Sequence, residues 1–95
     1  MKRLFAHGTL IVAPGASDAL NKNGHTLSDF LDRHTRGDWG DDANEDDRRI
    51  NDLAVAHGGR ILSAYRLRDG DILWLHTDAA RFSTLVMLPR EDEEC

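Results

Sequence analysis

Serine and histidine are the residue types in this chain that could support nucleophilic catalysis, because a histidine can take the proton of a nearby serine hydroxyl. If Asp69-Gly70 forms a two-residue hairpin turn, counting outward places His76 opposite Ser63, and Ser83 follows on the next strand. Asp78 is the one nearby carboxylate. Such a cluster on strands is typical of hydrogen-bonded polar side chains, so we expect no catalytic residues and no enzymatic activity.

The histidines also raise the question of a metal site. There are five, at His7, His25, His34, His57 and His76. Their spacing matches no usual zinc pattern, and the single thiol, Cys95, is the last residue. Glycine-rich phosphate-binding, Gly-x-Ser-x-Gly and His-Glu-x-x-His motifs are also missing. We therefore expect no metal and no cofactor.

A dense acidic segment is a candidate surface for a protein partner. The net charge of −5 disfavours direct binding to nucleic acid, which needs lysine and arginine at phosphates. The acidic density exceeds what the start of a helix requires. The candidate partner-binding residues are Asp38, Trp39, Asp41, Asp42, Glu45, Asp46 and Asp47. In the alternative reading, these carboxylates only stabilise a helix N-terminus and Trp39 fills a gap between helices.

The predicted hairpin gives a second candidate surface, which would bind a ligand. Tyr65 would face Trp74 on one side of the sheet. The candidate ligand-binding residues are Ser63, Tyr65, Trp74, His76, Arg81 and Ser83. Both faces of the predicted sheet are apolar, so we expect the second face to be covered by another segment, a ligand or a partner subunit. A homodimer through that face is compatible with either function.

Apolar runs predict the strands that position these residues. Three consecutive strands are expected at 60–67, 72–77 and 83–88, and a short strand at 10–13 precedes the helical part of the chain. The order β-α-α-α-β-β-β predicts an α+β fold, with an antiparallel sheet of C-terminal hairpins and helices packed on one face. We expect a single domain over residues 1–89 and an acidic tail over residues 90–95.

Three helices are expected between the first strand and the others. The first begins at Pro14 and ends at Asn23-Gly24. The second follows Thr26 and ends near His34, with a buried stripe of Leu27, Phe30, Leu31 and His34. A protonated imidazole at His34 would favour the helix dipole. The third begins at Asp42, as the N-cap residue, and ends at Gly58-Gly59. Its packed face is predicted to consist of Ile50, Leu53, Ala54 and His57.

The chain also lacks a signal-peptide pattern and any apolar run of membrane-spanning length. The single cysteine is typical of a reducing compartment. We therefore expect a cytoplasmic protein that does not contact a membrane.

An ordered set of motifs runs from residue 10 to residue 89. It includes Ala13-Pro-Gly-Ala16, Gly37-Asp-Trp-Gly-Asp41, Leu62-Ser-Ala-Tyr65, Asp69-Gly70 and Trp74. In these motifs the chain resembles a family of small, uncharacterised bacterial proteins labelled "plasmid-related protein" and sometimes "type I restriction endonuclease subunit M". The chain has neither the length nor the motifs of a methyltransferase or a nuclease.

The resemblance implies a setting of plasmids and other mobile genetic elements. In that setting we expect a non-enzymatic protein-binding module that inhibits host defence, of the anti-CRISPR or anti-restriction type. Its partner would be a nucleic-acid-processing complex bound through the acidic surface. The alternative is a small-molecule or nucleotide-binding domain that uses the Tyr65/Trp74 face.

Overall fold

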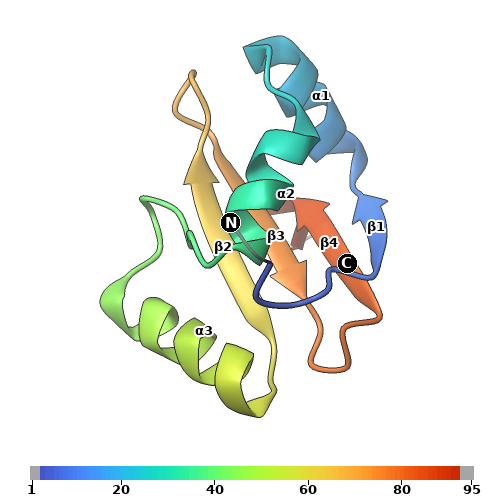
Figure 1. The fold of residues 1–95 in the computed structure, drawn as a ribbon. Helices are drawn as coiled ribbons and strands as arrows, with labels where there is room; N and C mark the ends of the chain where they lie inside the picture. The colour runs from blue at the N-terminus through green and yellow to red at the C-terminus, as the bar shows by residue number, and fades with distance from the viewer. Residues whose placement is uncertain (1–2, 93–95) are drawn as a thin grey trace.

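The computed structural model describes residues 3–92, which fold as a four-stranded sheet with four helices (Figure 1). The α+β class and the order of the first seven elements are confirmed. In chain order the elements are β1 (Thr9–Val12), α1 (Pro14–Asn23), α2 (Leu27–Thr35), α3 (Glu45–His57), β2 (Ile61–Arg66), β3 (Ile72–Thr77), β4 (Ser83–Met87) and α4 (Pro89–Asp92).

The strands are ordered β1-β4-β3-β2 across the sheet. The three C-terminal strands form antiparallel hairpins as predicted, whereas β1 adds to β4 in parallel. The sequence left the neighbour of the first strand open, and the structure places this strand at the edge of the sheet beside β4. Hairpin neighbours must run antiparallel, but β1 is separated from β4 by most of the chain, so its direction is not fixed by a short turn.

The connection between β2 and β3 is one residue longer than predicted. The Leu67 N–H donates to the Asp71 carbonyl at 2.8 Å, and the Gly70 N–H donates to the Leu67 carbonyl at 3.0 Å. These bonds enclose a three-residue loop, with Gly70 at φ 91° in its last position. Glycine in a left-handed conformation at this point is typical of three-residue hairpins.

The longer loop shifts the register of the hairpin by one residue. Trp74 lies opposite Ala64, and Tyr65 lies opposite Leu73. Because side chains alternate along a strand, the shift moves Tyr65 to the face opposite Trp74. The predicted Tyr65/Trp74 face is therefore wrong, and so is the pairing of Ser63 with His76.

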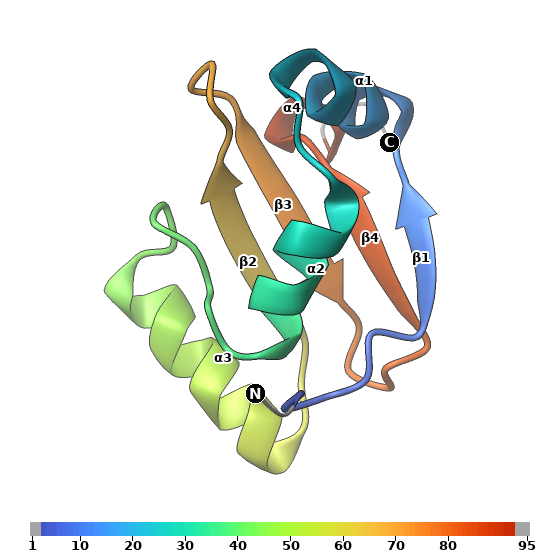
Figure 2. The same cartoon turned by 45° about the horizontal axis from the view of Figure 1, so that its top comes forward.

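Helices α1 and α2 cover one face of the sheet, and α3 lies beside the edge formed by β2 (Figures 1 and 2). Buried side chains of the covered face pack against Phe30 and Leu31 of α2 and Leu20 of α1. The buried sheet residues of this core are Tyr65, Leu67, Leu73, Leu75, Val86 and Leu88. Helices α1 and α2 have the predicted bounds. Pro14 begins α1, and Gly24, at φ 68°, ends α1 before α2 starts.

Helix α3 begins later than predicted and packs through other residues. Its N-cap is Asn44, whose side chain accepts the Asp47 N–H at 2.8 Å, so the expected cap at Asp42 is wrong. Ile50 and Leu53 are 54% and 55% exposed. His57 is exposed as well, so the predicted packed face holds only for Ala54. The helix packs along a sheet edge, where Asn51 and Ala54 are its buried residues.

Residues after Pro89 are not simply a tail, because 89–92 form α4. The Glu91 carboxylate accepts the Gly15 N–H at 2.8 Å and the Leu88 N–H at 2.9 Å, which ties α4 to the start of α1. Residues 93–95, including Cys95, lie outside the described residues.

Candidate functional site

The sheet face turned away from α1 and α2, called the open face below, carries apolar side chains across all four strands. One row consists of Leu62, His76, Leu85 and Ile11, and the next consists of Ala64, Trp74 and Met87. Leu62, Trp74, His76 and Leu85 are half-buried, and Ile11 is 50% exposed. An apolar surface of this kind on a small protein is typical of a contact surface.

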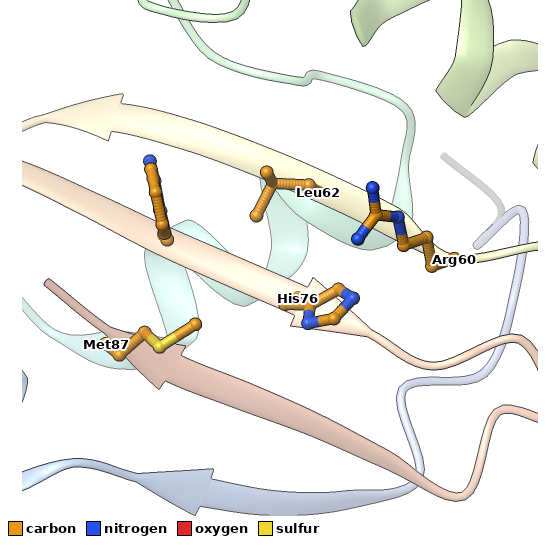
Figure 3. Close-up of a pocket in the computed structure, with 5 residues that line it drawn as sticks. Arg60, Leu62, His76 and Met87 are labelled. Carbon is orange, nitrogen blue, oxygen red and sulfur yellow. The ribbon is translucent and has the colours of Figure 1, made fainter. Parts of the chain in front are cut away.

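A hollow of about 110 Å³ lies on the open face and is called the Trp74 hollow. It is lined by Arg60, Leu62, Trp74, His76 and Met87. Figure 3 shows the Arg60 and His76 side chains near each other, with Leu62 farther along β2 and Met87 on β4. The lining contains a guanidinium and an imidazole but no carboxylate. It therefore suits an apolar group, with the Arg60 guanidinium and the His76 imidazole as its polar lining.

The predicted ligand-binding residues do not form one site. Trp74, His76 and Ser83 lie on the open face, whereas Ser63 and Tyr65 lie fully buried on the covered face. The Tyr65 hydroxyl donates to the Asp38 carbonyl at 2.6 Å, and burial raises the pKa of this phenol.

Arg81 is also unavailable to a ligand, because its guanidinium holds backbone carbonyls. It donates to the carbonyls of Gly59 at 2.6 Å, Asp78 at 2.8 Å and Ala54 at 3.1 Å. These bonds fasten the β3–β4 turn to the end of α3. Sequence reasoning did not assign Arg60, Leu62 or Met87 to a site, and a three-residue loop at Gly70 would have brought Leu62 to the Trp74 face.

Several predicted partner-binding carboxylates are held in ion pairs. Asp38 pairs with Arg33 at 2.6 Å, Asp42 with Arg66 at 2.7 Å, and Asp46 with Arg49 at 3.8 Å. The hydrogen bond from Arg33 lowers the pKa of Asp38. Asp41, Glu45 and Asp47 have no ion pair among residues 3–92. Asp41 and Glu45 are exposed, whereas Asp47 is half-buried.

Trp39 is not a surface residue. It is 3% exposed and packs in a cluster with Ala43, Ala54 and Ile61. Its indole N–H donates to Asp52 at 3.0 Å. The interpretation of Trp39 as a residue that fills a gap is confirmed, and its assignment as a partner-binding residue is wrong because the ring is enclosed.

A buried chain of hydrogen bonds, which sequence reasoning missed, passes through His34. The imidazole contacts the hydroxyl of Ser63 at 2.6 Å through Nδ1 and that of Thr77 at 2.8 Å through Nε2. Thr77 contacts Thr84 at 2.6 Å, and the Thr84 hydroxyl donates to the His7 carbonyl at 2.7 Å. Because a carbonyl can only accept, each hydroxyl of the chain donates toward His7.

This direction and the lowered pKa of His34 together define its protonation. Thr77 donates to Thr84, so it accepts from the imidazole, and Nε2 carries a proton. Burial lowers the pKa of His34 to about 3, so Nδ1 is unprotonated and accepts from Ser63. The imidazole is therefore neutral, and the expected protonated form at the helix end is wrong. Since His34 and Ser63 are both fully buried, they cannot meet a substrate.

Residues 3–92 also lack two features that would point to particular functions. No three His, Cys, Asp or Glu side chains in this range are grouped as ligands of one metal ion. None of the helices in the same range has the length and apolar character needed to cross a membrane. Comparison with models of known protein families, with curated proteins and with solved structures finds no match to this chain.

Proposed function

We propose that the protein is a non-enzymatic protein-binding module that holds its partner on the open face. The observation that carries the proposal is the Trp74 hollow, set in apolar rows that cross the whole sheet. Tryptophan, methionine and arginine are enriched at protein interfaces. All three residue types line this hollow.

The volume of the Trp74 hollow can be compared with what each of the two functions expected from the sequence would require. Its volume of about 110 Å³ lies below the roughly 300–1,000 Å³ of clefts that hold drug-sized ligands. It is closer to the engineered cavity of about 150 Å³ that holds benzene. One apolar side chain of a partner would fill the hollow, whereas a nucleotide would not. This comparison favours the protein-binding function over the small-molecule alternative.

The charge of the lining suggests the partner's chemistry at this point. Arg60 and His76 sit beside Leu62 and Met87 without a carboxylate in the lining. A partner that places a carboxylate next to its inserted apolar side chain would complement Arg60. We therefore expect the partner to present an apolar residue flanked by Asp or Glu.

The class of partner is proposed on the resemblance alone. The resembled family suggests a mobile-element setting, and we propose that the partner is a host nucleic-acid-processing complex inhibited by this chain. The carboxylates of Asp41, Glu45 and Asp47 form a second candidate contact for such a complex, because they are free of ion pairs within the described part of the chain.

A tagged capture experiment from a host lysate tests the proposal with three variants. Trp74→Ser truncates the large side chain at the centre of the open face. Leu53→Ser is the control, because it truncates an exposed apolar side chain on α3. A third variant neutralises Asp41, Glu45 and Asp47 together. We expect the partner to be retained by the wild type and Leu53→Ser and lost by Trp74→Ser. Loss only in the neutralised variant, or no partner at all, would contradict binding through the open face.

A further inference from the structure

The two edges of the sheet differ in hydrogen bonding, and outward peptide groups of the β2 edge already have partners. The Asn51 side chain accepts the Leu62 N–H at 3.0 Å and donates to the Leu62 carbonyl at 2.8 Å. The Ala64 N–H donates to the Trp39 carbonyl at 2.9 Å, and the Asp42 N–H approaches the Ala64 carbonyl at 3.4 Å. These bonds use the outward peptide groups of β2, so no further strand can add there.

The β1 edge is open. The Thr9 N–H donates to the carbonyl of Phe82, the residue before β4, at 2.9 Å, and the Ala13 N–H donates to the carbonyl of Val86 in β4 at 2.8 Å. Alternation along the strand then turns the peptide groups of Leu10 and Val12 away from β4. No hydrogen bond found among residues 3–92 uses these outward groups. Figures 1 and 2 both show β1 at the margin of the sheet.

The side chains of this edge strand are apolar and exposed. Leu10, Ile11 and Val12 are 37%, 50% and 38% exposed. Proteins usually protect an open edge with charged residues, proline or a bulge. From Thr9 to Ala13 the sequence contains no charged residue and no proline. Such a strand is suited to pairing with another strand.

We propose that two copies of this chain pair through β1, antiparallel about a twofold axis. In this register Leu10 of one copy lies opposite Val12 of its partner, and Ile11 lies opposite Ile11. The outward N–H and C=O groups of Leu10 and Val12 then form four hydrogen bonds, in the alternation that antiparallel strands require. The pairing uses only peptide groups and side chains of β1.

Continuity of the open face favours a second copy as the occupant, and no charge on the strand opposes the pairing locally. Although each chain carries a net charge of −5, no carboxylate lies on the strand that would meet its copy. Ile11 lies in the same cross-strand row as Leu85 and His76, so the open faces of two copies would join into one surface. A four-residue strand alone buries less than the roughly 1,600 Å² of a standard interface, so the dimer should be weak.

Sedimentation equilibrium over a range of concentrations tests this pairing. We expect the average mass to rise from 10.7 kDa toward twice that value. Leu10→Pro removes one outward N–H and leaves the bonds to β4 intact, so it should remain monomeric. Leu10→Ala shortens the same side chain but keeps the N–H, so it should still dimerise. A wild type that stays monomeric, or a dimer that persists in Leu10→Pro, would overturn the proposal.

Two controls distinguish pairing through β1 from self-association through the open face. Trp74→Ser should leave the dimer unchanged, and loss of the dimer in this variant would instead assign self-association to the open face. If Leu10→Pro fails to fold by circular dichroism, amide exchange of the wild type decides the question. Pairing predicts that the Leu10 and Val12 amides exchange more slowly as concentration rises, and concentration-independent exchange would refute it.

Discussion

Acidification should destabilise this protein through a single buried side chain, His34. Its pKa is lowered from 6.5 to about 3 by burial, with smaller contributions from His7, His76 and Arg81. Because the folded pKa lies below the unfolded one, the unfolded state binds the proton first as pH falls. The stabilisation is therefore complete above pH 6.5 and is lost progressively toward pH 3.

The two pKa values set the magnitude of this effect. At pH 5 the unfolded state is protonated at this residue and the folded state is not, which lowers the free energy of unfolding by about 2 kcal/mol relative to pH 8. Below pH 3 the loss approaches about 5 kcal/mol, since each pKa unit is worth about 1.4 kcal/mol. Small domains are stable by about 5–15 kcal/mol, so acid unfolding is expected.

Urea unfolding at pH 8, 7, 6 and 5 measures this loss, with His34→Gln as the matched variant. Glutamine keeps a donor and an acceptor but does not titrate. The wild type should be the more stable protein at pH 8, and its advantage should shrink by about 2 kcal/mol at pH 5. A difference between the two proteins that stays constant over this range would refute a neutral, buried His34.

Four other substitutions, at three positions, test packing and hydrogen bonding, each by urea unfolding. Gly40→Ala should prevent folding or lower the free energy of unfolding by several kcal/mol. Gly40 has a φ of 95°, and a Cβ added there would overlap the Ala64 carbonyl oxygen. A variant as stable as the wild type would contradict this close contact. Asn51→Leu should cost about 2 kcal/mol by leaving both Leu62 peptide groups without their partners. Asn51→Asp keeps the acceptor for the Leu62 N–H but places a buried carboxylate oxygen against the Leu62 carbonyl, so it should destabilise at least as much. A negligible effect of either substitution would argue against the paired bonds. Leu53→Ser should stay within about 0.5 kcal/mol of the wild type, because the residue is 55% exposed.

The elements that carry local signals could be predicted from the sequence. Pro14 and Gly24 bound α1, and the stripe that ends in Phe30, Leu31 and His34 correctly identified the buried side of α2. These features depend on residues within one or two turns of each other. The three C-terminal strands were also predicted, because their apolar runs are separated by short polar turns.

The register of the β2–β3 hairpin could not be predicted, and the candidate site depended on it. Asp69-Gly70 fits a two-residue turn, and Gly70 also fits the last position of a three-residue loop. The two alternatives differ by one residue, which is enough to separate Tyr65 from Trp74. The open face therefore became visible only in the structure.

Residues whose roles depend on tertiary contacts were also missed. Asn51 looked like a polar residue of α3, but its amide closes the β2 edge. Trp39 donates to Asp52, and His34 contacts Ser63 and Thr77; these partners lie far away in the sequence, so no local pattern identifies them. The apolar residues Ile50 and Leu53 were expected to pack, yet α3 lies at the side of the sheet and leaves them exposed.

The affinity of the captured partner for the wild type and for Trp74→Ser tests the central claim most directly. A buried interface tryptophan is worth at least about 2 kcal/mol, so Trp74→Ser should weaken binding about 30-fold while Leu53→Ser leaves it unchanged. Equal dissociation constants for the wild type and Trp74→Ser would show that the open face does not hold the partner.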